Sequence, residues 1–182
     1  IHYDFEERPA ARPTKTSRVY DRHKDLNAAF GQRYGWERPN WFAAKGQEPL
    51  NQYSFHTRRT NWFERVGLEV VGTRERAALL DLTPFATHEV SGPGAEAFLD
   101  SMVANRLPKK KGGITLAHAL TPTGGVESEF TITREDEDRF YLVSSGAAER
   151  HDHDLLLKNL PKDNSVKLVN KTMDLGTLVV CG

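Results

Sequence analysis

The pattern of apolar and polar positions predicts a domain of mixed helices and strands downstream of residue 65. Its most regular helix begins at Ala95 and stops before Pro108, with apolar residues at spacings of three and four. A second helix is expected over residues 147–160, where Pro161 would close it. The other predicted elements are a short helix at 74–80 and strands at 88–91, 114–120, 126–133, 139–144, 166–170 and 177–180. Short strands joined by turns predict an antiparallel sheet with packed helices, which is the α+β class.

The chain upstream of residue 65 has a different pattern. Ser17 can cap a helix whose apolar face extends to Phe30, and Gly31 and Gly35 are helix stop signals. Helical periodicity then disappears, and all 3 tryptophans lie between positions 36 and 62. Such an aromatic segment suits either anchoring in grooves of a neighbouring domain or a local core of its own, and both interpretations stay open. We expect an aromatic-rich connector over residues 1–65 and a domain over residues 66–182.

The strand expected at 126–133 offers a candidate binding face. Its alternation puts Val126, Ser128, Phe130 and Ile132 on one side and Glu127, Glu129, Thr131 and Thr133 on the other. Residues 135–138 are all acidic and predict a turn. If Thr133 pairs with Arg139 across this acidic turn, the antiparallel register is determined. The register then sets Thr131 opposite Tyr141 and Glu129 opposite Val143.

This face would combine a carboxylate, a hydroxyl, a phenol and an apolar side chain. Such a set suits a flat heterocycle with polar edges, because the acid accepts N–H donors while apolar groups cover the ring. The alternative is a half-exposed sheet surface with acids that face water. A register slip of one residue would separate the set.

Other candidate chemistry is weaker. The run His151, Asp152, His153 and Asp154 resembles a metal cluster, but helical neighbours point about 100° apart, so at most two could share a face. No metal site is predicted. The chain has no Gly-x-Gly-x-x-Gly, no phosphate-binding Gly-Lys-Ser/Thr loop and no Gly-x-Ser-x-Gly elbow. The single cysteine, Cys181, cannot form an internal disulfide, which favours a reducing compartment.

Composition and charge exclude further classes. The chain has 25 Lys and Arg against 25 Asp and Glu, so it lacks the cationic excess of proteins that bind nucleic acid or anionic membranes. No apolar run reaches the roughly 18 residues of a membrane span, and the start resembles no signal peptide. Because residue 1 is not Met and the end lies within a predicted strand, we expect a fragment of a longer chain.

Several motifs resemble a known family. Residues 74–85 and 90–95 resemble the opening of the folate-binding aminomethyltransferase domain of the glycine-cleavage T-protein, and residues 120–130 are similar to its next signature. Residues 34–42 and 59–67 resemble the connector of the dimethylglycine and sarcosine dehydrogenases. In that family, a flavoprotein half that binds FAD oxidises an N-methyl group. A C-terminal half passes the carbon to tetrahydrofolate.

The resemblance implies roles for four residues. The family's pterin-contacting acid, Asp in the T-protein pattern, corresponds to Glu129, which would orient the pterin and assist proton transfer. The conserved tyrosine corresponds to Tyr141, and Phe85 and Val143 would line the same pocket. Since Glu has one more methylene than Asp, its reach differs. The remaining folate contacts would come from sequence beyond residue 182.

The resemblance also implies an activity. The chain would be part of a flavin-linked dehydrogenase or oxidase that demethylates an N-methylated glycine such as dimethylglycine and forms 5,10-methylenetetrahydrofolate. Its partners would be a small-molecule substrate, folate, and a protein or oxygen as electron acceptor, in the bacterial cytoplasm or the mitochondrial matrix. The alternatives are a non-catalytic folate-binding or assembly module and a flavin-free folate-dependent aminomethyltransferase or demethylase.

Overall fold

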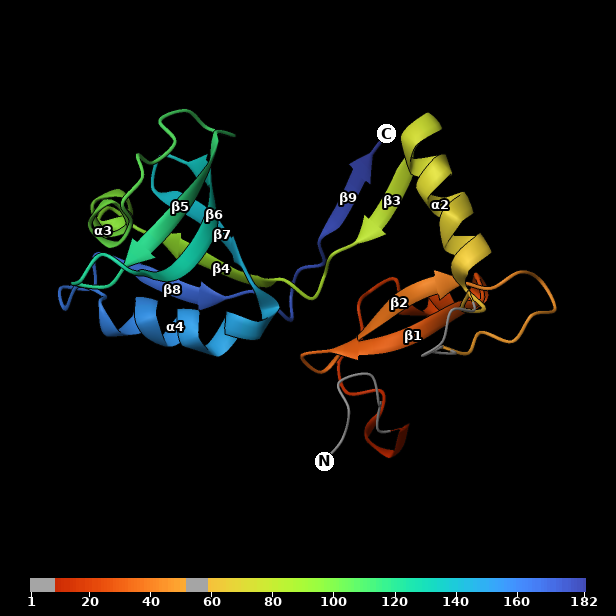
Figure 1. The fold of residues 1–182 in the computed structure, drawn as a ribbon. Helices are drawn as coiled ribbons and strands as arrows, with labels where there is room; N and C mark the ends of the chain where they lie inside the picture. Colours follow the sequence, from red (N-terminus) through yellow and green to blue (C-terminus); the bar gives the residue numbers. More distant parts are fainter. Residues whose placement is uncertain (1–8, 52–58) are drawn as a thin grey trace. The chain divides into compact units, whose positions relative to one another are not determined.

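The structure is a computed structural model that describes residues 9–51 and 59–182 (Figure 1). The start of the chain, on which the signal-peptide expectation depends, lies outside the described residues. Two compact units are present: the first comprises Ile1–Pro84 with Gly176–Gly182, and the second comprises Phe85–Leu175. No described helix is long and apolar enough to cross a bilayer. Each unit is described by itself below.

The second unit is a five-stranded antiparallel sheet with two helices. Its strand order is β5-β6-β7-β4-β8, and every neighbouring pair is antiparallel. The strands are β4 (Ala86–Ser91), β5 (Ile114–Leu120), β6 (Val126–Asp136), β7 (Arg139–Ser144) and β8 (Lys167–Asn170). The helices are α3 (Ala95–Met102), the 3-10 turn η2 (Gly146–Ala148) and α4 (Glu149–Lys158). This arrangement confirms the predicted α+β class.

Both helices pack on the same face of this sheet. The core contains Phe98 and Leu99 from α3 and Leu156 from α4, packed against Phe130 and Leu142 of the sheet. The opposite face is open in this unit: Ile114 and Leu116 of β5 are exposed. Because β-strand side chains alternate, every second residue of β6 and β7 projects onto that open face.

Three predicted elements of this unit end elsewhere than expected. Helix α3 ends at Met102 instead of continuing to Leu107, because Val103 is already extended and buries its side chain in the core. Helix α4 ends at Lys158, two residues before the expected end at 160. Strand β6 continues to Asp136.

Arg134 explains the greater length of β6. Its side chain is on the core side and only 8% exposed. It donates from Nε to the Pro108 carbonyl at 2.6 Å and from one guanidinium nitrogen to the Glu137 carbonyl at 2.8 Å. It also pairs with Glu96 at 2.7 Å and lies 4.5 Å from the centre of the Phe140 ring. Because these partners satisfy the buried cation, the strand continues past the predicted turn.

The first unit contains a hairpin that the periodicity did not predict. Helix α1 (Tyr20–Asp25) is shorter than expected, and β1 (Ala28–Arg33) and β2 (Trp36–Phe42) follow it. Tyr34 and Gly35 join them with φ angles of 53° and 85°, the left-handed geometry of a tight hairpin turn. The predicted helix to Phe30 was therefore wrong: what looked like a stop signal is a strand-reversing turn.

The aromatic stretch supplies a local core in this unit. Trp41 is buried with Ala29 and Ala43, and Trp62 and Val66 pack against them. Trp36 is buried as well, on the same hairpin. These contacts favour the local-core interpretation for Trp36 and Trp41. The assignment of residues 1–65 as a connector stays a prediction.

The helix predicted at 74–80 was also wrong. Helix α2 (Phe63–Glu75) ends where that helix was expected to begin, and β3 (Ala78–Asp81) follows. Strand β3 pairs with β9 (Leu178–Cys181) from the other end of the chain. Local periodicity cannot reveal this pairing, because the partner lies about a hundred residues away.

Candidate functional site

A cavity of about 250 Å³ opens in the second unit where β6 begins and β7 ends. Three of the four predicted ligand-contacting residues line it, namely Phe85, Glu129 and Val143. The remaining lining residues are Glu127, Ser128, Thr131, Ser144, Ser145, Ala148 and Asp152. The cavity therefore combines carboxylates, hydroxyls and apolar side chains.

The pairing of β6 with β7 brings Thr131 and Val143 opposite each other, and this register differs from the expected one. Thr131 pairs with Val143 and Thr133 pairs with Tyr141, whereas Arg139 pairs with Asp136. The predicted pairing was wrong by two residues, because β6 extends to Asp136 with an irregularity after Arg134. A shift of two preserves the alternation, so Glu129 and its predicted neighbours still share one face.

Tyr141 lies outside the cavity lining. It is on the same face as Val143, but two residues earlier in β7, which is roughly 7 Å away along the strand. The register shift is the cause, because the tyrosine now lies across from Thr133 instead of Thr131. Tyr141 is partly exposed and could still reach the far end of a ligand that extends along this face.

Phe85 and Glu129 are both exposed where they line the cavity. Phe85 comes immediately before β4, whose first residue, Ala86, pairs with Ser144 of β7. Phe85 is 39% exposed where it lines the cavity. The Glu129 side chain is 59% exposed, so its carboxylate remains hydrated and can accept hydrogen bonds from an arriving molecule.

The base of the cavity holds a polar pair that the sequence did not reveal. Ser128 donates to Oδ1 of Asp152 at 2.6 Å, and His151 Nδ1 lies 3.2 Å from the same oxygen. Oδ2 of Asp152 is buried and has no hydrogen-bond partner among the described residues. One signal was available: a serine at an inward position of a strand requires a polar partner.

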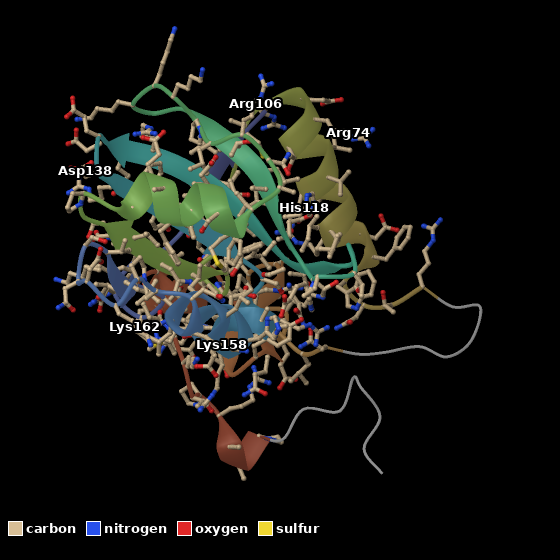
Figure 2. The ribbon with its side chains drawn as sticks, turned by 90° about the vertical axis from the view of Figure 1, so that its left-hand side faces the viewer. Arg74, Arg106, His118, Asp138, Lys158 and Lys162 are labelled. Carbon is tan, nitrogen blue, oxygen red and sulfur yellow. The ribbon has the colours of Figure 1, made fainter. Side chains whose placement is uncertain are left out.

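His118 is the second residue that sequence reasoning missed. It is directly opposite Glu129 in the β5-β6 register, and its Nε2 lies 2.9 Å from Oε2 of Glu129. Figure 2 labels His118 on β5. A register count back from the turn at 121–125 would pair His118 with Ser128, and only the irregularity between Ala119 and Leu120 places His118 opposite Glu129.

The histidines near α4 do not form a metal centre. No group of three or more potential ligands occurs within the described residues. His88 on β4 is fully buried, and its ring stacks on that of His153 with the centres 5.4 Å apart. Burial, and then the neighbouring His153, lower the pKa of His88 from 6.5 to about 4. His88 is therefore neutral at physiological pH and belongs to the core.

The arrangement can bind the polar edge of a flat molecule. Glu129 offers acceptors, Thr131 a hydroxyl, and Phe85 and Val143 apolar surface. The volume is somewhat below the roughly 300 to 1,000 Å³ of complete small-molecule sites. A cavity of this size suits part of a small molecule, and His118 contacts the Glu129 carboxylate.

The fold defines a class of protein. The structure resembles the glycine cleavage system aminomethyltransferase T of Bartonella henselae, with a TM-score of 0.72 over 93% of this chain and 41% of that chain. The sequence identity is 23%, so this likeness concerns the fold. The chain thus has the mixed helix and antiparallel sheet fold of the T-protein aminomethyltransferases.

The sequence comparisons define the family. Residues 19–182 match the GCVT N-terminal domain, and the chain belongs to that family. It is 37% identical over its whole length to the mitochondrial dimethylglycine dehydrogenase of Homo sapiens. It is 30% identical, again over its whole length, to the formaldehyde-forming 4-methylaminobutanoate oxidase of Paenarthrobacter nicotinovorans. The chain spans only 21% and 22% of the lengths of these two enzymes.

Proposed function

We propose that this chain is part of a flavin-linked enzyme that demethylates an N-methylated glycine, with dimethylglycine as the substrate. The released carbon would be transferred to tetrahydrofolate to give 5,10-methylenetetrahydrofolate. The chain contributes one wall of the folate site. The observation that carries the proposal is the Glu129 carboxylate beside Phe85 and Val143 in one cavity, in a member of the GCVT N-terminal domain family.

The residues present fit the edge of a pterin. A pterin ring is flat and has N–H donors along one edge, which an ionised carboxylate can accept as a pair. Glu129 would hold this edge, and Phe85 and Val143 would cover the ring. Tyr141, further along the same face, would contact a more distant part of the ligand. Bound tetrahydrofolate supplies the nitrogen that takes up the one-carbon unit.

Glu129 would orient the bound ligand and would assist the transfer of a proton. Its carboxylate lines the cavity together with Phe85 and Val143, and it is accessible to solvent for exchange of a proton. FAD would be bound by another part of the full-length protein. We place the protein in the mitochondrial matrix or the bacterial cytoplasm, with a protein or oxygen as electron acceptor.

The experiment compares Glu129→Gln with the full-length wild-type protein. Dimethylglycine oxidation is measured with an artificial electron acceptor, and 5,10-methylenetetrahydrofolate is measured separately in the presence of tetrahydrofolate. We expect oxidation to be retained and the folate-dependent product to fall at least about tenfold, since an interaction of 1.4 kcal/mol corresponds to a factor of ten. Glu137→Gln removes an exposed acid of the same hairpin and is the matched control.

The alternatives give different results. Unchanged folate-dependent product in Glu129→Gln would overturn the role of this residue. Binding of tetrahydrofolate in isothermal titration without oxidation of dimethylglycine would instead indicate a non-catalytic module. Transfer of a one-carbon unit by a full-length protein that binds no flavin would indicate the flavin-free transferase.

A further inference from the structure

The contact between His118 and Glu129 is the most specific feature of the candidate site. The two residues are paired across β5 and β6, and Nε2 of His118 lies 2.9 Å from Oε2 of Glu129. Strand β5 is an edge strand of the sheet, and the His118 side chain is 33% exposed. Directly opposed residues hold their Cβ atoms about 5 Å apart, so the backbone register itself brings the two side chains together.

The chemistry of the pair determines where its proton lies. An ionised carboxylate only accepts hydrogen bonds, so Nε2 of His118 must carry the hydrogen, whether the ring is neutral or protonated. The donated bond uses one of the two lone pairs of Oε2 of Glu129, so this oxygen can still accept a second donor. Oε1 has no partner among the described residues, so one oxygen of the acid is held and the other is available.

An accessible glutamate needs such a partner if it is to bind a ligand well. Its three side-chain torsions are mobile when it is 59% exposed, and their ordering on binding would cost affinity. A hydrogen bond that already exists in the unbound protein reduces that cost, which is the basis of preorganisation.

We propose that His118 is a positioning residue for Glu129: it holds Oε2 and so directs Oε1 toward the N–H donors of a ligand in the cavity. This inference rests on the proposed folate site. His118 itself is not among the residues that line the cavity, so its effect is transmitted through Glu129.

The test uses the full-length protein and tetrahydrofolate as the probe. We expect His118→Ala to raise the dissociation constant of tetrahydrofolate about three- to tenfold, the range for one hydrogen bond to a charged group at a partly exposed site. The turnover number for dimethylglycine oxidation should not change. His118→Gln, which keeps an N–H donor at a similar distance, should restore most of the affinity. Ile114→Ala, on the same face of β5 but opposite Thr133, is the matched control and should bind normally.

A double-mutant cycle separates positioning from a general loss of structure. Because His118 acts through the acid, His118→Ala should weaken binding no further once Glu129 is Gln. Equal losses in the wild-type and Glu129→Gln backgrounds would overturn the inference, as would normal affinity in His118→Ala. If Glu129→Gln itself leaves tetrahydrofolate binding unchanged, both the inference and the proposed folate site are wrong. If Glu129→Gln weakens binding and His118→Ala does not, only the inference is wrong.

Discussion

Ser128 on β6 donates a hydrogen bond of 2.6 Å to Asp152 on α4, so strand and helix are joined at the base of the cavity that both residues line. Asp152 is fully buried, and its second oxygen has no partner among the described residues. A buried carboxylate is costly unless it is hydrogen-bonded. The Ser128 bond therefore stabilises the position of the strand that carries Glu129.

Asp152→Ala should destabilise the full-length protein by about 1 to 3 kcal/mol, because the buried Ser128 hydroxyl loses its acceptor. Replacement of both partners, Ser128→Ala with Asp152→Leu, should cost less than Asp152→Ala alone, since no unsatisfied polar group remains. The measurement is the midpoint of urea unfolding. Asp154→Asn, an exposed acid on the same helix, is the control. A double variant less stable than Asp152→Ala would contradict the explanation.

His88 should make stability depend on pH. Its pKa is lowered from 6.5 to about 4, first by burial and then by His153, so between these values the unfolded chain binds a proton that the folded chain does not. The contribution of the neutral His88 ring to the free energy of unfolding is complete above about pH 6.5 and is lost as the pH falls toward 4. The free energy of unfolding should fall by about 2 to 3 kcal/mol over this range.

His88→Leu tests this assignment, because leucine cannot titrate. Unfolding midpoints measured between pH 4 and 7 should vary less in His88→Leu than in the wild type. His23→Gln removes a histidine from the first unit and should leave the wild-type pH dependence of the second unit in place. An identical pH dependence in His88→Leu and the wild type would show that His88 is not the group responsible.

Arg134→Lys should destabilise the full-length protein by about 2 kcal/mol. Arg134 reaches the carbonyls of Pro108 and Glu137 and the carboxylate of Glu96 at once, and an ammonium group cannot reproduce this planar set of donors. Arg139→Lys is the matched control, since its pair with Glu135 is exposed and should change stability by less than about 0.5 kcal/mol. Equal thermal shifts in both variants would argue against the role of Arg134.

Gly92→Ala should be strongly destabilising, by about 2 kcal/mol or more. Gly92 follows β4 with a φ of 115°, which disfavours any side chain, and an added Cβ would meet the Ser165 carbonyl. Gly67→Ala, inside α2 with open space around it, should instead be neutral or stabilise by up to about 1 kcal/mol. Thermal unfolding of both variants tests the contrast, and a stable Gly92→Ala protein would refute it.

Local patterns predicted the class of the fold and most of its elements. Helix α3 begins at Ala95 as expected, and the alternation in β6 correctly places Phe130 in the core and Glu129 on the other face. These predictions succeed because amphipathic periodicity depends only on neighbouring residues and on which side is buried.

Contacts between distant segments were decided by the tertiary structure. The pairing of β3 with β9, the two-residue register shift that moves Tyr141 away from Thr131, and the burial of Arg134 all depend on partners elsewhere in the chain. The contacts of Glu129 with His118 and of Ser128 with Asp152 are of the same kind. The sequence by itself therefore determined which side of the strand carries the acid. Only the tertiary structure decided which side chains meet it, because register and packing are set by the free energy of the whole fold.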